Sequence, residues 1–183
     1  MRILSNIQRS ILAPPRLAVL EMKSLSRALF VAYLLVLLWL VLFKLSVDIP
    51  SVLRHSIRSL NLIPFAHLSA GGVRDLVSNI VVFIPFGVSL GLNVKQATFR
   101  QKFACILIFS LAVEIIQYIL AIGITDTTDV LTNTFGGFLG LTFYEASRKY
   151  MDSEKLDRFI NVIGAIVFIL SLLLRFFVLR VRY

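Results

Sequence analysis

The sequence predicts an all-α protein, a polytopic transmembrane helical bundle of about five membrane spans. Of its 183 residues, 58% are hydrophobic, whereas soluble domains have roughly 45–50% apolar residues. Only 16% of the residues are charged, and the mean hydropathy is +0.88. Five apolar stretches approach the roughly 20 residues that an α-helix needs to cross a bilayer. These observations place the chain in the membrane class.

The predicted spans cover residues 28–47, 76–94, 103–124, 129–146 and 159–179. No small-residue cleavage site follows the first span, so we expect that span to remain as an anchor rather than to act as a signal peptide. The fifth span ends in a basic tail and is also compatible with a helix that lies along the membrane interface.

The connection between the first two spans, residues 48–75, is too long for a simple turn and contains "NLIPF" at 61–65. Pro64 removes an amide donor and disfavours helix at Ile63. Non-helical backbone at membrane depth survives only where protein or a wet cavity covers it. We therefore predict a re-entrant or interfacial segment that covers the polar cluster described below. An interfacial helix without a ligand is an equally open interpretation.

Basic residues between the spans indicate the orientation of the chain. Twelve Lys and Arg residues lie in 1–27, 95–102 and 147–158, against five in the remaining connections and the tail. The positive-inside rule then predicts a cytoplasmic N-terminus in the cytoplasmic (inner) membrane. The expected organisation is a cytoplasmic N-terminal segment at 1–27, a transmembrane domain at 28–146, a cytoplasmic loop at 147–158, and the fifth span with its tail at 159–183.

The net charge of +9 does not indicate nucleic-acid binding, because the charges cluster between apolar spans. The single cysteine, Cys105, excludes an intrachain disulfide and a cysteine-rich metal site. We expect it to be a small buried hydrophobe. The two histidines, His55 and His67, do not match a metal-ligand spacing, and we predict neither a metal nor a cofactor.

Polar residues recur inside or beside three of the spans at helical spacing. They are Asp75 with Asn79, Glu114 with Gln117, and Asp129 with Asn133, which Asp126 precedes. Each pair falls on one face of its helix. Because consecutive spans run in opposite directions, the three polar faces are expected to meet in the outer half of the membrane.

Glu114 is the central residue of this predicted cluster. A charged group at mid-span costs about 2.5 kcal/mol or more, so the carboxylate must face protein or water, or take up a proton. An intramembrane ionisable residue is a functional-site hypothesis by default. The alternative is a structural clasp that joins spans two, three and four. Asn61 and Arg74, from the connection between the first two spans, complete the candidate ligand-binding set.

Small residues predict close contacts between helices. Gly136 and Gly140 form a GxxxG pattern, and Gly87 and Gly91 are spaced in the same way. Such patterns let two helix backbones approach closely. Pro85 falls inside the second span and is expected to kink it.

The ordered set of elements resembles the VanZ-like family of bacterial membrane proteins. The matching stretches are "NLIPF" (61–65), "NIVVFIPFG" (79–87), "EIIQ" (114–117) and "DTTDVLTNTFGGFLG" (126–140), within about residues 30–146. The family is named for a protein that lowers bacterial susceptibility to the glycopeptide antibiotic teicoplanin.

The resemblance implies that the family's acidic and amide positions fall on Glu114, Gln117, Asp126, Asp129 and Asn133. Many members have a longer polar loop before the fourth span, where this chain has the short "GITDTTD". Antibiotic recognition through that loop is therefore not supported.

Three functions remain open. The first is a binding or transport-like module, whose outward-facing pocket engages an envelope lipid, a cell-wall precursor or a lipophilic glycopeptide. The second is a membrane enzyme that uses paired carboxylates on a lipid-linked substrate, although no nucleophile with an adjacent base is evident. The third is a structural or partner-binding membrane protein. The expected partner in each case is the lipid bilayer, and the sequence identifies no protein partner.

Overall fold

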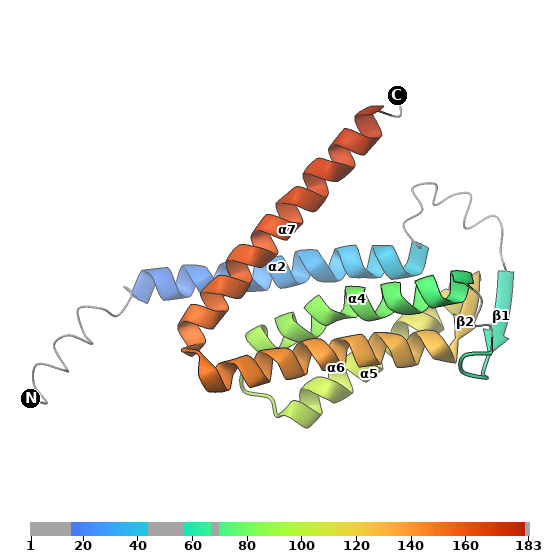
Figure 1. The fold of residues 1–183 in the computed structure, drawn as a ribbon, viewed down its shortest axis with the longest axis horizontal. Coiled ribbons are helices and arrows are strands. Elements are labelled where there is room, and N and C mark those ends of the chain that lie inside the picture. The colour runs from blue at the N-terminus through green and yellow to red at the C-terminus, as the bar shows by residue number, and fades with distance from the viewer. Residues whose placement is uncertain (1–15, 44–56, 67–69, 182–183) are drawn as a thin grey trace, which may run out of the picture.

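The computed structural model describes residues 16–43, 57–66 and 70–181. Within these residues the chain forms five helices and two short strands (Figure 1). Their order is α2 (Arg16–Phe43), β1 (Ile57–Asn61), α4 (Ala70–Asn93), α5 (Phe99–Leu120), β2 (Ile122–Asp126), α6 (Thr127–Tyr150) and α7 (Ser153–Val181). The predicted all-α helical bundle is confirmed.

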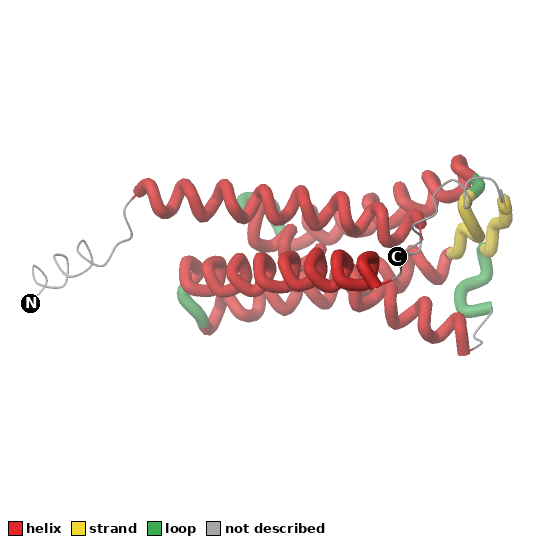
Figure 2. Tube along the Cα trace, turned by 90° about the horizontal axis from the view of Figure 1, so that it is seen from above, coloured by secondary structure: helices red, strands yellow, loops and turns green. Residues whose placement is uncertain are grey.

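Helices α2, α4, α5 and α6 run along one another, and the chain reverses direction at each connection (Figures 1 and 2). Both strands lie at one end of this bundle, with the first turns of α4 and α6 and the last turn of α5. We call this the strand end. The beginning of α2, the connection 94–98 and the turn between α6 and α7 lie at the other end, which we call the loop end. The described parts of the predicted cytoplasmic segments therefore share one end.

The ends of α5 and α6 are defined by local hydrogen bonds. Thr98 caps α5 in a capping box, in which its hydroxyl accepts from the N–H of Gln101 while Gln101 accepts from the N–H of Thr98. Ala121 ends α5 in the left-handed conformation, with φ of 53°. Asp126 caps α6, and Asp129 follows in its first turn, where a carboxylate stabilises the helix dipole.

The two strands were not predicted. β1 pairs with β2 in parallel, with Ile57 opposite Ile122 and Asn61 opposite Asp126. The predicted third span, which extended to residue 124, was therefore too long, since α5 ends at Leu120. Each strand has only five residues, and its partner is distant in the sequence, so alternation along either segment alone gives little signal.

The core lies where α2, α4, α5 and α6 meet. Three phenylalanine rings form its centre, with centroid separations of 5.9 Å for Phe83 and Phe86 and 4.8 Å for Phe86 and Phe109. These separations suit edge-to-face and offset packing of aromatic rings. Leu37 and Ile106 pack with them and are fully buried. The aromatic run "FIPF" of α4 thus fixes the positions of its neighbours.

Helices α4 and α6 approach closely through their glycines. A Cβ atom added at Gly140 would lie 1.9 Å from the carbonyl oxygen of Ile84, and one at Gly136 would lie 2.2 Å from that of Ile80. Gly87 meets the α6 backbone in the same way. The GxxxG pattern thus lets the two backbones touch, as predicted. This contact fixes the polar residues of α4 opposite those of α6.

Three of the described helices are long and apolar enough to cross a membrane. They are Lys23–Phe43 of α2, Gly72–Asn93 of α4, and Phe99–Leu120 of α5. The structure thus supports three of the five predicted spans by length and composition. α6 and α7 do not meet this criterion within the described residues. α7 begins against the bundle and then runs away from it (Figure 1).

The expectation that Cys105 is buried was wrong, because its side chain is exposed on α5. Only one face of α5 contacts the other helices, and apolar residues such as Ile108 and Ile119 cover the rest. In a membrane protein the outward surface is apolar as well, so hydrophobic character alone does not indicate burial.

Candidate functional site

Polar residues from every described element of the strand end gather in one place. This strand-end cluster consists of Asn61, Asn79, Glu114, Gln117, Asp126, Asp129 and Asn133. β1, α4, α5, β2 and α6 each contribute at least one member. The predicted meeting of three polar faces is thus seen for Asn79 of α4, for Glu114 and Gln117 of α5, and for Asp129 and Asn133 of α6, but not for Asp75.

Asp126 occupies the junction between β2 and α6 and connects three elements. Its backbone N–H donates to Glu114 Oε2 at 3.2 Å. Its Oδ1 accepts from the N–H of Thr128 at 2.7 Å, which caps α6. Its Oδ2 accepts from Asn61 Nδ2 at 3.0 Å, which attaches β1. One carboxylate therefore ends the strand, begins the helix and holds the neighbouring strand.

A second carboxylate joins α4 to α6. Asn79 Nδ2 donates to Asp129 Oδ1 at 2.7 Å, a short hydrogen bond of the kind that charged acceptors form. The two residues come from the helices that the glycines bring into contact. Because an ordered amide restricts the carboxylate, Asp129 is held in a fixed position.

The polar pair of α5 is deeply buried. Glu114 and Gln117 are each only 3% exposed. Gln117 Nε2 donates to the carbonyl oxygen of Val41 at 3.1 Å, which ties α5 to the end of α2. The Thr125 hydroxyl donates to the backbone carbonyl of Glu114 at 3.4 Å. The pair therefore binds its own helix to both α2 and β2.

Asn133 differs from the other members. It is fully buried, yet neither its Oδ1 nor its Nδ2 has a hydrogen-bond partner among the described residues. Gln117 Oε1 and Thr134 Oγ1 are in the same condition. A buried polar atom without a partner costs about 1–3 kcal/mol, so native proteins contain few of them. Three residues within one bundle end make this region a candidate for ligand contact.

The "NLIPF" segment docks against the start of α6. Asn61 Oδ1 accepts from the N–H of Ile63 at 3.2 Å, a turn geometry that Asn favours. The Phe65 N–H donates to Thr128 Oγ1 at 2.9 Å. Phe65 has a φ of 59°, which is rare for a bulky residue and costs free energy that the surroundings must supply. The strained turn fixes the aromatic ring beside the cluster.

An apolar groove of about 390 Å³ runs along the seam between α4 and α6. Its lining consists of Phe65, Leu76, Ile80, Leu131, Thr132 and Phe135. Asn79 and Asp129 belong to the same two helices, so the groove and their hydrogen bond share the seam. The site thus combines an acidic, amide-rich cluster with an apolar groove between the same two helices.

Two predicted site residues remain apart from the cluster. Asp75 and Arg74 are exposed, and neither forms a hydrogen bond or ion pair with another described residue. Both histidines, His55 and His67, lie outside the described residues. The sequence analysis missed Phe65 and Thr128; the run of polar residues after Asp126, typical of a helix N-terminus, was the available signal.

The chemistry of the cluster is that of a hydrogen-bond acceptor with a few amide donors. Three carboxylates, from Glu114, Asp126 and Asp129, lie within one bundle end. No group of three metal-ligating side chains lies close enough to hold a metal ion in the part of the chain that the structure describes. The arrangement suits hydroxyl, amide or ammonium groups of a ligand rather than a bare anion.

These features define an integral membrane protein, a helical bundle with a polar cluster buried at one end. Comparison with known proteins is more specific. The model of the VanZ/LLP1 family matches residues 30–148. Protein VanZ of Enterococcus faecium is 50% identical over 161 residues, which cover 88% of this chain and 98% of that protein. The chain therefore belongs to the VanZ/LLP1 family, as the sequence motifs indicated. No solved structure matches it.

Proposed function

We propose that the strand-end cluster and the adjoining groove bind an amphiphilic envelope molecule, and that this binding lowers susceptibility to teicoplanin-type glycopeptides. The ligand is an envelope lipid, a cell-wall precursor or the lipophilic glycopeptide itself. The protein then lies in the cytoplasmic membrane as a multi-pass protein, with its N-terminus in the cytoplasm and its strand end outward. The positive-inside rule supports this orientation.

The observation that carries the proposal is the meeting of two kinds of surface on one helical seam. The groove offers apolar walls to an acyl chain, with Phe65 and Phe135 among its lining residues. Burial of apolar surface there contributes roughly 25 cal/mol per Å². The carboxylates and amides beside it accept and donate hydrogen bonds to a polar head. Ligand sites in proteins typically combine apolar walls with a few fixed polar groups.

The buried groups without partners also support binding rather than structure alone. A clasp needs every polar atom satisfied, since each unsatisfied one is destabilising. Asn133 offers one acceptor and two donor hydrogens that no described residue uses. Its neighbour in the sequence, Thr132, lines the groove. A polar ligand group that reached Asn133 would recover the lost hydrogen bonds.

Thermal unfolding of purified protein tests the proposal. The ligands are teicoplanin and a lipid-linked cell-wall precursor, both of which carry hydroxyl and amide groups, each added to the wild type and to Glu114→Gln. A ligand at 100 times its Kd stabilises the folded state by about 2.7 kcal/mol, or roughly 5–10 °C for a chain of this size. We expect one ligand to stabilise the wild type and not the variant. Glu154→Gln, the same change at the loop end, should respond to teicoplanin like the wild type.

Two exposed phenylalanines of α6 provide a matched pair for the groove. Phe135 lines the groove, whereas Phe143 does not, and their side chains are 51% and 61% exposed. We expect Phe135→Ser to restore teicoplanin susceptibility in cells that express the protein, and Phe143→Ser to leave resistance intact. Equal resistance in both variants, at equal protein levels, would exclude the groove from function.

A structural clasp is the second candidate, and a specific observation favours it. The hydrogen bonds of Asn61 to Asp126 and of Asn79 to Asp129 each join two elements far apart in the sequence. If the cluster served only this purpose, Glu114→Gln would lower the melting temperature without ligand, and no compound would shift the melting of the wild type.

A further inference from the structure

A cavity at the loop end shares no residue with the strand-end cluster. It has a volume of about 540 Å³ and lies between the start of α2, the end of α4 and the first turns of α7. Its wall includes the charged residues Lys23, Arg27, Lys95 and Arg158. Two carboxylates, Glu154 and Asp157, also line it. Four cations against two carboxylates leave the cavity with an excess of positive charge.

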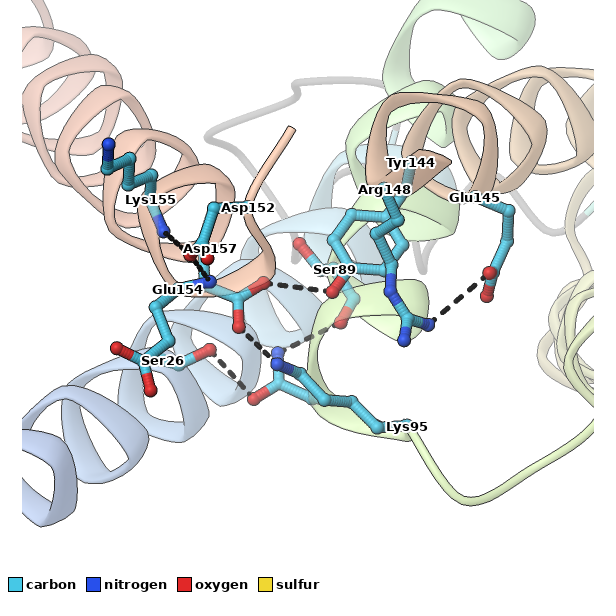
Figure 3. A network of polar contacts seen from close by, with 11 residues as sticks. Ser26, Ser89, Lys95, Tyr144, Glu145, Arg148, Asp152, Glu154, Lys155 and Asp157 are labelled. Carbon is cyan, nitrogen blue, oxygen red and sulfur yellow. Dashed lines mark hydrogen bonds and ion pairs between the residues drawn. The ribbon is translucent and has the colours of Figure 1, made fainter. Parts of the chain in front are cut away.

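One carboxylate is already engaged by the protein. Asp157 Oδ1 accepts from the Tyr144 hydroxyl at 2.9 Å, and its Oδ2 forms an ion pair with Lys95 (Figure 3). Lys23, Arg27 and Arg158, by contrast, form no ion pair with any described residue. Three cationic side chains are therefore available to an anion in the cavity, opposed by Glu154 alone.

The polar wall of the cavity contains two residues that bond to the protein and one that forms no hydrogen bond with any described residue. The Ser26 hydroxyl donates to Asn93 Oδ1 at 2.9 Å, and Asn93 Nδ2 donates to the carbonyl of Ser89 at 2.9 Å (Figure 3). Asn161 of α7 lines the same cavity and is only 6% exposed, yet it forms no hydrogen bond with any described residue. On the wall of a cationic cavity, a nearly buried amide that no described residue engages can donate its N–H groups to the acceptor oxygens of a ligand.

We infer that the loop-end cavity binds a phosphate-bearing group. Guanidinium groups pair with phosphate oxygens through two parallel hydrogen bonds, and Arg27 and Arg158 lie on opposite helices, α2 and α7. The Asn161 amide supplies a neutral donor. The cavity adjoins the ends of two candidate membrane spans, α2 and α4, where headgroups of anionic lipids lie. An anionic phospholipid or a soluble phosphate ester could supply this chemistry.

Binding measurements on the purified full-length protein test this inference. The probes are short-chain phosphatidylglycerol, phosphatidylcholine with the same chains, and glycerol phosphate. The test variant is Arg27→Gln with Arg158→Gln. The matched control is Arg100→Gln with Lys149→Gln, which removes the same charge from exposed loop-end positions outside the cavity. Asn161→Leu tests the neutral donor without any change of charge.

We expect phosphatidylglycerol to bind the wild type about tenfold more tightly than phosphatidylcholine does. The cavity pair should weaken this binding about tenfold or more, Asn161→Leu severalfold, and the control pair less than about twofold. If glycerol phosphate binds as tightly as phosphatidylglycerol and the variants weaken its binding in the same way, the phosphate site is supported. That result would assign the site to soluble phosphate esters. The inference is overturned if no probe binds, or if the cavity and control pairs weaken binding equally.

Discussion

The two ends of the bundle use polar residues in opposite ways. At the strand end, the carboxylates of Asp126 and Asp129 accept hydrogen bonds from nearby amides and from backbone N–H groups. At the loop end, Lys23, Arg27 and Arg158 form no ion pair with any described residue. The first end is held in place and acidic, whereas the second is open and basic.

The difference teaches that a polar cluster in a membrane protein has to be judged by the partners of its atoms, not by its composition. Side chains that satisfy one another fix the geometry, and those without partners are available to a ligand. At the strand end, Asn133, Gln117 and Thr134 have polar atoms without a partner among the described residues, within a network that is otherwise mostly satisfied. At the loop end, three of the four cations that line the cavity form no ion pair with a described residue. The predictions below separate the two ends by the sizes of their effects.

The largest loss of stability is expected at the glycine contact between α4 and α6, the two helices that carry residues of both ends. Gly140→Ala places a Cβ atom 1.9 Å from the carbonyl oxygen of Ile84, and overpacking of this kind costs about 1–3 kcal/mol or more. Because α4 and α6 carry residues of both ends, we expect ligand binding at the strand end and at the loop-end cavity to weaken together. Folded yield and melting temperature report the loss. Gly164→Ala, with nothing within 4 Å of the added atom, should melt at or slightly above the wild-type temperature, and equal losses in the two variants would contradict the packing argument.

The next effect contrasts two helix caps. Asp126→Ala removes the cap of α6 together with the hydrogen bond to Asn61, and we expect a loss of about 2 kcal/mol in the free energy of unfolding. Asp152 caps α7 through the N–H groups of Glu154 and Lys155 and is exposed. Asp152→Ala should cost no more than about 1 kcal/mol.

Denaturant unfolding of the two cap variants under the same conditions gives both values. If Asp126→Ala and Asp152→Ala lowered the free energy of unfolding equally, Asp126 would contribute no more to stability than an ordinary helix cap.

The smallest effect is expected for the ion pair at the rim of the loop-end cavity. The Lys95 side chain is 43% exposed, and exposed pairs contribute about 0–1 kcal/mol and weaken with salt. Lys95→Gln should therefore change stability little, and the change should fade at high salt. Lys102 pairs with Glu145 at 2.6 Å and is only 2% exposed, so Lys102→Gln should cost more. If Lys95→Gln lowered the melting temperature more than Lys102→Gln, the buried ion pair would not be the more stabilising of the two.

Much of this architecture could be predicted from the sequence, because helical spacing determines which residues share a face. The spacing of Asn79, Glu114 and Asp129 within apolar spans placed them on inward faces, and chain reversal placed them at one end. The glycines of "FGGFLG" predicted a close contact between helices, although the pattern did not identify α4 as the partner of α6. The helical bundle and the family are confirmed, while ligand binding by the cluster stays a prediction.

Other features depend on contacts that no local pattern encodes. The pairing of Asn61 with Asp126 joins segments 65 residues apart, and neither strand is long enough to signal itself. Cys105 resembles a core residue because lipid-facing and core-facing surfaces are equally apolar. Ser26, Asn93 and Asn161 are ordinary helix residues in the sequence, and only the fold collects them around one cavity.

Asn133→Leu tests the central claim most directly, because it separates ligand binding from folding. Leucine has the same number and branching of side-chain heavy atoms, and the substitution removes two buried polar atoms that no described residue satisfies. We therefore expect the melting temperature without ligand to stay the same or rise, while the stabilisation by teicoplanin or the responding envelope lipid disappears. A variant that keeps the full ligand-induced shift, or one that loses stability without ligand, would contradict the account and leave the strand-end cluster as a structural clasp.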